Sequence, residues 1–363
     1  MSANRWLSSG NFNLSYTEEN RIHKTRTDSL FLWGFLALVA LIPPVFDPAN
    51  STMYVINNMM IVMLAVMGLN ITTGFTGLIN VGQAALMGTG AYTVGIIARY
   101  FGDEAGFLVY YWPLAIFAGG LVGAAFGAFV GLPSFRLKHL YLAITTISFQ
   151  IIFEWVIKRS DFAYQGQTIG MPRVMVGPWK VGIKQHYDFW FYVIFAFVIL
   201  CGFGMHNLLR SKYGRAMIAV RDNDRAADAM GIHPGKMKIL SFALAGFFAG
   251  MGGVMKAYLD RGVGIESYTI HYSIEYLAMA IVGGLGSFSG VFWGTGVVIW
   301  LDYWVHKISE LVNEVLQLST LATALRPLIF GLMIVLFLMF EPRGVNNWWT
   351  ILKNYTKRWP FKF

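Results

Sequence analysis

The sequence predicts an all-α membrane protein with many spans, and three features support this class. Of the 363 residues, 56% are apolar and 13% are charged, and the mean hydropathy is +0.53, which is outside the range of ordinary soluble domains. Apolar runs of about 20 residues, the length that crosses a bilayer, recur along the chain. Lys and Arg gather in the segments between these runs, as the orientation rule for membrane proteins requires.

Ten apolar runs are long enough to cross a bilayer core of about 30 Å. They cover residues 29–46, 53–73, 75–98, 110–132, 140–158, 188–209, 238–258, 268–285, 287–306 and 320–340. The first run is too long for the apolar part of a cleavable secretory signal, so we expect an anchor helix there. The prediction is a cytoplasmic tail at 1–28, a transmembrane domain at 29–340 and a basic cytoplasmic tail at 341–363.

The segment 210–238 decides the orientation of the spans. It holds seven Lys or Arg residues between two apolar runs, and short basic loops of this kind remain cytoplasmic. When ten spans alternate from a cytoplasmic N-terminus, the cytoplasmic segments hold 18 of the 28 Lys and Arg residues. Both termini and this loop are cytoplasmic together only with that alternation, so the charge distribution supports ten spans.

The same loop is predicted to be partly folded. Ala216–Val220 is an apolar patch framed by Arg215 and Arg221, and Asn223 can cap a short helix that Gly231 can end. A solvated connection is the ordinary interpretation of a charge run. A plain connection would be shorter and would carry neither the patch nor the cap, so the pattern favours a docking surface for a cytoplasmic partner.

The longest predicted outer loop covers residues 159–187. Its middle reads RVMVGPWKVGI and alternates around Gly177 and Pro178, which fits a small hairpin as well as an irregular loop. Both interpretations stay open from the sequence. A folded loop would suit contact with something on the outer face.

Two glycine clusters interrupt the apolar runs, one in each half of the chain. We predict helix breaks at Gly74, Gly77, Gly283, Gly284 and Gly286, and such paired breaks are typical of transporters built from repeats. Broken helices are tolerated at membrane depth only inside protein or along a water-filled cavity. We therefore expect the polar side chains beside the first cluster to line a path for a solute, namely Asn70, Thr73, Thr76, Asn80 and Gln83. The glycines at 88, 90 and 95 are expected to serve tight helix packing.

Several kinds of chemistry are not predicted. The sequence has no G-x-x-x-x-G-K-[ST] loop for a nucleotide and no G-x-S-x-G turn for a nucleophile. Its seven His residues are scattered singly and Cys201 is its single cysteine, so we expect neither a metal site nor a disulfide within the chain. No basic stripe with stacking aromatics indicates nucleic acid. An enzyme is therefore disfavoured, and no catalytic residue is expected.

Few carboxylates lie within the predicted spans. Glu154 is one turn from Lys158, which predicts a structural ion pair, and Asp302 lies beside aromatic residues near the end of a run. Glu275 is the least explained of the three. A proton-coupled carrier would usually show more buried carboxylates or His than this.

Five blocks of the sequence resemble the LivM-type permease subunits of bacterial ABC importers for branched-chain amino acids. They read GLNITTGFTGLINVGQAALMGTGAYTVGII, RLKHLYLAITTISF, SKYGRAMIAVRDNDRAADAMGIHPGKMKILSFALAGFFAGMGGVMKA, SIEYLAMAIVGGLGSFSGVFWGT and LIFGLMIVLFLMFEPRGV. The blocks are spread over residues 53–345, which is most of the chain. Five blocks in one order are a more specific signal than any single motif.

The resemblance implies a type II ABC importer permease with glycine-broken helices, multi-pass in the bacterial inner membrane. It implies a second homologous permease subunit, two cytoplasmic ATPase subunits that bind the ATP, and a periplasmic binding protein, and no cofactor on this chain. The solute would be a branched-chain or hydrophobic amino acid or a related small polar solute, since relatives also carry urea, amides and aromatic acids. A stand-alone carrier or channel for small amides such as urea is the competing interpretation.

On this resemblance the 210–238 loop couples the permease to the ATPase. Its arginines would meet acidic or dipolar groups on the ATPase, and its apolar residues would fill a groove there. The residues assigned to this role are Arg215, Ala216, Met217, Ile218, Arg221, Arg225 and Gly231.

Overall fold

The structure, a computed structural model, describes most of the membrane region. The described residues are 33–34, 36–43, 50–101, 106–135, 140–176, 179–180, 186–316, five positions between 331 and 339, and 344–358. The tail 1–28, part of the predicted span 29–46 and most of the predicted span 320–340 lie outside the described residues.

Five helices of the described part are long and apolar enough to cross a membrane. Each lies within a few residues of a predicted span. They are α4 (Asn50–Leu69) with its π-helical extension η1 (Asn70–Phe75), α7 (Trp112–Gly131), α8 (Leu140–Arg159), α9 (His186–Arg210) and α12 (Pro234–Leu259). The chain is therefore a mostly helical, multi-pass membrane protein.

Three other predicted spans differ from simple crossing helices. The prediction of one helix over 75–98 is wrong, because residues 76–82 are not helical and α5 (Gln83–Phe101) begins after them. Gly77 has φ +73°, a left-handed conformation that turns the chain at this point. Helix α13 (Ile270–Gly283) has 14 residues, about 21 Å of helix, and is shorter than a bilayer core. Helix α14 (Phe288–Leu316) continues past the predicted end at 306.

Short elements complete the described fold. They are α6 (Gly106–Tyr110), η3 (Leu132–Phe135), η4 (Asp161–Gly166), α10 (Lys212–Asp222), α11 (Asp224–Ala229), η5 (Ile265–Tyr268) and α16 (Val345–Arg358). Strand β1 (Ile169–Gly170) pairs antiparallel with β4 (Gly262–Val263), and β2 (Met175–Val176) pairs antiparallel with β3 (Trp179–Lys180). The β2–β3 pair confirms the hairpin interpretation of the outer loop.

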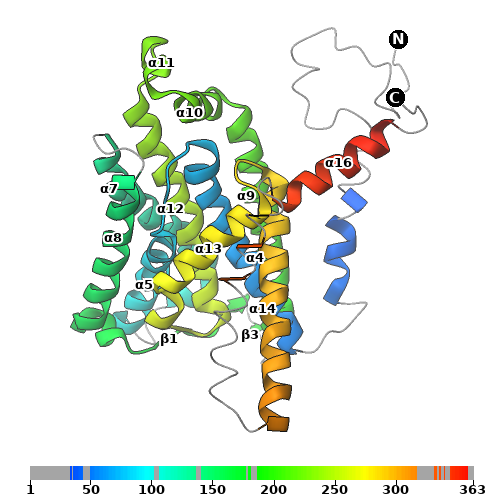
Figure 1. Ribbon diagram of the computed structural model, residues 1–363. Helices are drawn as coiled ribbons and strands as arrows, with labels where there is room; N and C mark the ends of the chain where they lie inside the picture. The colour runs from blue at the N-terminus through cyan, green and yellow to red at the C-terminus, as the bar shows by residue number, and fades with distance from the viewer. Residues whose placement is uncertain are drawn as a thin grey trace, which may run out of the picture.

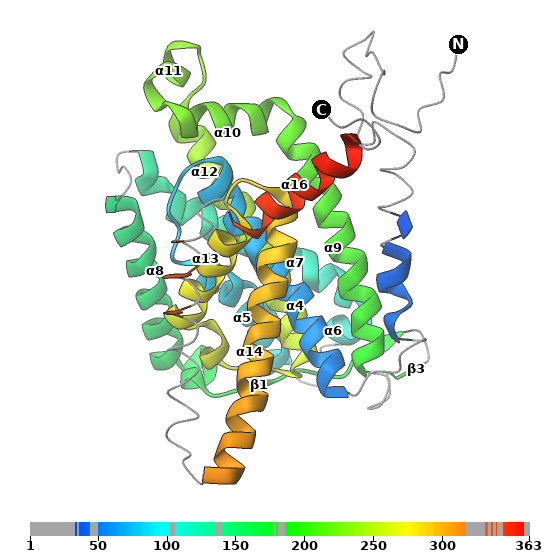
Figure 2. The same ribbon diagram turned by 45° about the vertical axis from the view of Figure 1, so that its right-hand side comes forward.

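The helical bundle has two distinct ends. Helices α10, α11 and α16 lie at one end, here called the basic end, and strands β1 and β3 lie at the other, the hairpin end (Figure 1 and Figure 2). The basic loop and the predicted outer loop therefore lie at opposite ends of the bundle, as their assignment to opposite sides of the membrane requires.

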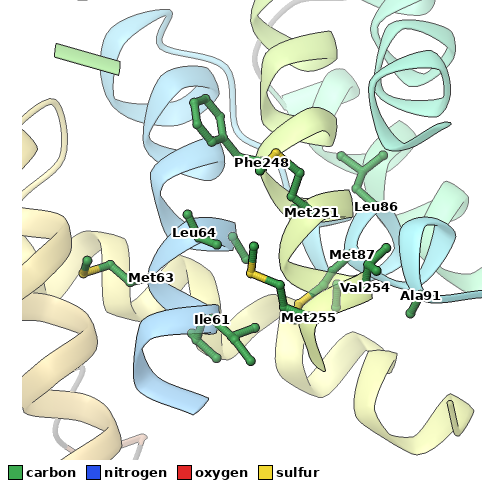
Figure 3. Close-up of a cluster of buried hydrophobic side chains, with 14 of the residues drawn as sticks. Ile61, Met63, Leu64, Leu86, Met87, Ala91, Phe248, Met251, Val254 and Met255 are labelled. Carbon is green, nitrogen blue, oxygen red and sulfur yellow. The ribbon is translucent and has the colours of Figure 1, made fainter. Parts of the chain in front are cut away.

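Helix α12 is the centre of the packing and contacts α4, α5 and α7. Figure 3 shows Ile61 and Leu64 of α4, Met87 of α5, and Met251 and Met255 of α12 gathered in one buried cluster. The unbranched methionine side chains can fill irregular gaps between the helices. Because lipid tails are as apolar as these side chains, the helices associate through close packing rather than through exclusion of water.

Glycines bring the helices around α12 into close contact. A Cβ atom built on Gly123 of α7 would overlap the carbonyl oxygen of Gly246 in α12, and one built on Gly246 would overlap Gly123 in return. The expectation that glycines 88, 90 and 95 serve tight packing is confirmed, because Cβ atoms there would lie against Phe153, Gly250 and Val263.

The Gly123–Gly246 contact predicts a stability effect. Gly246→Ala should lower the stability by about 1–3 kcal/mol, because the added methyl group meets backbone that cannot turn aside. The measurement is the thermal unfolding midpoint in detergent micelles. Gly204→Ala is the control, since a Cβ atom on Gly204 would have nothing within 4 Å. Equal midpoints for the two variants would contradict the packing role.

The two ends of the bundle predict a labelling pattern. Met230 at the basic end is 83% exposed, and Phe162 in η4, which precedes β1, is 42% exposed. Phe162→Cys should react with a membrane-impermeant maleimide in intact spheroplasts, and Met230→Cys only in inverted vesicles. The native Cys201 is buried and should give no signal. Labelling of Met230→Cys in intact spheroplasts would show that the basic end faces outward, contrary to the predicted orientation.

Candidate functional site

The basic loop is folded through local caps. The Ser211 hydroxyl accepts hydrogen bonds from the backbone of Tyr213 and Gly214 at the start of α10. The Asn223 side chain accepts from Arg225 N at 3.0 Å and from Ala226 N at 3.1 Å, which caps α11 as predicted. Gly231 follows α11 with φ +83°, so the predicted helix end is also confirmed.

An ion pair ties α11 to the membrane helix that follows it. The Lys238 ammonium lies 2.6 Å from the Asp224 carboxylate, and the Lys238 side chain is only 8% exposed. The pair is partly buried, since the Asp224 side chain is 30% exposed, and it joins α11 directly to α12. The loop is therefore a shaped surface at the basic end.

The residues assigned to docking divide between the surface and the interior. Arg215 and Arg225 are exposed, and Ala216 and Ile218 are half-buried. Met217 is fully buried, so its side chain packs within this chain and does not reach outward in this structure. No role was predicted for Met230, although its side chain is 83% exposed, the largest exposed fraction of any large apolar residue that the structure describes at this end. Its position directly after a capped helix was the available signal.

The two glycine clusters contact each other in the structure, although Gly74 and Gly286 are 212 residues apart in the sequence. A Cβ atom built on Gly74 in η1 would overlap the backbone nitrogen of Gly286. The Asn70 amide spans the contact: its nitrogen donates to Ser287 O at 2.8 Å and its oxygen accepts from Gly286 N at 2.8 Å. We call this contact the glycine junction, formed by Asn70, Gly74, Gly286 and Ser287.

The guanidinium of Arg221 reaches the glycine junction from α10. Its Nη1 donates to the Gly74 carbonyl oxygen at 2.9 Å, and its Nε lies 3.2 Å from the Asp222 carboxylate. Of the seven residues assigned to docking, Arg221 is therefore the one whose side chain points both to the surface and into the membrane domain.

Helix α5 begins inside the protein, and side chains satisfy its first backbone N–H groups. A helix start leaves such donors without helical partners, and at membrane depth they must bond within the protein. Two bonds reach N–H groups of the helix itself: Ala84 N donates to Ser273 Oγ at 2.9 Å and Ala85 N donates to Gln150 Oε1 at 2.8 Å. Two more reach the residues just before it: Val81 N donates to Thr146 Oγ1 at 3.1 Å and Gly82 N donates to Asn80 Oδ1 at 2.9 Å.

The predicted path residues are mostly enclosed in this structure. Asn70, Thr76, Asn80 and Gln83 are each at most 2% exposed. Gln83 donates to Ala65 O at 2.8 Å and accepts from Asn80 at 2.9 Å. Thr73 is half-exposed, and its hydroxyl oxygen is buried with no hydrogen-bond partner among the described residues. The structure brings these residues to the broken helix, and their place on a solute path stays a prediction.

The residues that cap α5 from other helices were not predicted. Gln150 accepts from Ala85 N and from the Ser273 hydroxyl, and it donates to Tyr268 O at 2.7 Å and to Glu154 at 3.1 Å. A glutamine within an otherwise apolar run was the available signal. Glu154 also accepts from Ile270 N at 2.7 Å and lies 3.9 Å from Lys158, so its predicted structural pairing is confirmed.

A cavity of about 400 Å³ lies where the outer parts of α4, α9 and α12 meet. Its lining is polar at the Tyr54–Asp260 contact, where the phenol donates to the carboxylate at 3.1 Å, and the Lys256 ammonium lies 3.0 Å from the same carboxylate. Its lining residues are Tyr54, His186, Tyr187, Leu259, Asp260 and Arg261. Among the described residues no cluster of His, Cys, Asp or Glu is suited to a metal ion.

These features define the class of the protein: a multi-pass helical membrane protein with an internally capped broken helix and a folded loop at one end. The comparison with known families gives the particular one. The chain belongs to the permease components of branched-chain amino acid transport systems, whose family profile matches residues 51–338.

Curated relatives agree with this family. The chain is 28% identical to the high-affinity branched-chain amino acid transport system permease protein LivM of Salmonella typhimurium, over 88% of this chain and 75% of that protein. It is 23% identical to the probable permease protein LivM of Methanocaldococcus jannaschii, over 77% and 88%. It is 22% identical to the permease protein LivH of Escherichia coli, over 78% and 90%. No solved structure matches the chain. The LivM-type resemblance is confirmed.

The α5 cap predicts that Gln150 is needed for stability. Gln150→Leu would leave Ala85 N, the Ser273 hydroxyl and Tyr268 O short of a partner, and each unsatisfied buried group costs about 1–3 kcal/mol. We expect the thermal midpoint in detergent to fall clearly. Ser148→Ala on the exposed face of the same helix, where the hydroxyl bonds only to Ile144 O, should leave it unchanged. A stable Gln150→Leu variant would contradict the cap.

Proposed function

We propose that this chain is the membrane-spanning permease subunit of an ATP-driven importer. The solute would be a branched-chain or hydrophobic amino acid, or a related small polar solute. The observation that carries the proposal is the folded basic loop, which stands at one end of the bundle as a shaped surface in a chain of this family. Because the sequence has no nucleotide-binding loop, the proposal assigns ATP to two separate cytoplasmic ATPase subunits.

The proposed topology has ten spans in the bacterial inner membrane, with the tails 1–28 and 341–363 in the cytoplasm. The position of α16 at the same end of the bundle as α10 and α11 (Figure 1 and Figure 2) supports a cytoplasmic C-terminal tail. Lys and Arg near helix ends favour the cytoplasmic side, which agrees with the charge of the 210–238 loop.

The proposed partners follow from the two ends and from the relatives. Relatives named LivM and LivH are both permease proteins of branched-chain amino acid transport, which supports pairing with a second homologous permease subunit. A periplasmic binding protein would meet the hairpin end, where the β2–β3 hairpin stands and the 400 Å³ cavity lies between the helix ends. The solute would enter the membrane domain from that side.

The docking surface would consist of the outward residues of the folded loop. Arg215 and Arg225 would meet acidic or dipolar groups of the ATPase. The exposed Met230 and the half-buried Ala216 and Ile218 would contact apolar side chains of the ATPase. A surface held by two caps and a partly buried ion pair is ordered before it binds, so docking costs little conformational entropy.

The solute path would open beside the start of α5. Asn70, Thr73, Thr76, Asn80 and Gln83 surround the broken helix, and the Thr73 hydroxyl already lacks a partner among the described residues. A solute could form hydrogen bonds with these side chains once the enclosed arrangement separates, because groups bonded to one another in one state can exchange partners in another.

Reconstitution tests the proposed function. In proteoliposomes that also contain the second permease subunit and receive the binding protein, uptake of labelled leucine should require both ATP and added ATPase subunits. Met230→Asp should reduce uptake and ATPase co-purification by about tenfold, the effect of losing one apolar anchor. Phe162→Asp at the hairpin end should retain ATPase co-purification. Uptake by the purified chain alone would identify a stand-alone carrier or channel. Competition by urea or amides would identify the solute class.

A further inference from the structure

The basic loop contacts the broken helix at η1 through the side chain of Arg221. We propose that Arg221 is a positioning residue that transmits movement of α10 to the glycine junction, and through it to α4 and to the α13–α14 turn. The inference rests on the proposed function, since it assumes that an ATPase moves α10. It also revises the role of Arg221, from a contact with the ATPase to a link within the permease.

The Arg221 contact falls on a carbonyl group that the helix itself cannot satisfy. Gly74 lies in the last turn of η1, where carbonyl oxygens lack helical donors. Arg221 Nη1 supplies the missing donor at 2.9 Å. Because Arg221 bonds to a backbone oxygen, a shift of Arg221 displaces the backbone of η1 and not only one side chain.

The arginine side chain fits between two glycines. A Cβ atom built on Gly77 would lie 2.7 Å from Arg221 Cγ, and one built on Gly286 would lie 3.2 Å from its Nη1. Both glycines also have positive φ, +73° and +76°. Larger residues at either position would displace the guanidinium, so the space for Arg221 depends on glycine in both halves of the chain.

The glycine junction joins those halves into one unit. The Asn70 amide donates to Ser287 O and accepts from Gly286 N, and Gly74 packs directly on Gly286. A displacement that Arg221 applies to Gly74 therefore reaches the α13–α14 turn through backbone contacts. Such a hinge of a few element-terminal residues is a common way to convert a small shift into movement of whole helices.

The first experiment compares two arginines of the same loop in the reconstituted complex with its ATPase subunits. Arg221→Gln should lower labelled leucine taken up per ATP hydrolysed by about five- to tenfold while hydrolysis continues, a coupling loss within the usual range. Arg221→Lys, which keeps a charged donor, should recover part of that ratio. Arg225→Gln should weaken ATPase co-purification and leave the ratio unchanged.

Each outcome of this comparison has a meaning. If Arg221→Gln behaves as Arg225→Gln does, or changes neither quantity, the transmission role is overturned. If the wild-type complex shows no ATP-dependent uptake at all, the proposed function fails, independently of Arg221.

A covalent link replaces the arginine in the second experiment. A Cβ atom on residue 77 would lie 3.5 Å from Arg221 Cβ, a separation at which a disulfide can form. The double variant Gly77→Cys, Arg221→Cys, made in a Cys201→Ser background, should therefore cross-link in membranes on mild oxidation. Oxidation should raise uptake per ATP by about threefold or more over the reduced form, because the tie restores the mechanical link. The Gly77→Cys single variant should not respond. Absence of the cross-link, or a cross-link without recovery, would overturn the proposal.

Discussion

The fold depends on one constraint, which is that every backbone polar group freed inside the membrane region must find a partner within the protein. Helix α5 starts in the interior, and its first N–H groups would otherwise be unsatisfied. Thr146, Gln150 and Ser273 supply acceptors from two other helices. The position of α8 and α13 relative to α5 is therefore fixed by hydrogen bonds as well as by packing.

Close glycine packing makes the broken helix possible. Helix α12 lies against α5 and α7 at Gly250 and Gly246, with backbone meeting backbone. Without a hydrophobic driving force between helices in lipid, such contacts provide much of the association energy. They form a rigid frame around the start of α5. Gly286 in the glycine junction and Gly77 close to it occupy conformations that other residues rarely adopt.

The basic loop is therefore ordered and in direct contact with the membrane domain. The loop is shaped by its own caps and by the Lys238–Asp224 ion pair, and it touches the glycine junction through Arg221. A loop that were only solvated would transmit no displacement. In the family of branched-chain amino acid permeases to which this chain belongs, this contact would give the ordered loop the proposed transmission role in addition to the proposed docking of a partner.

The sequence by itself determined the features that depend on neighbouring residues. Run length predicted most described spans, and Asn223, Gly231 and the Glu154–Lys158 pair were predictable because caps and one-turn pairs act over a few residues. Tertiary structure alone decided that Gly74 meets Gly286, that Gln150 caps α5 and that Arg221 turns inward while Met217 is buried. The reason is that these contacts join segments far apart in the chain. Local periodicity and composition carry no information about which distant backbone groups will be left without partners.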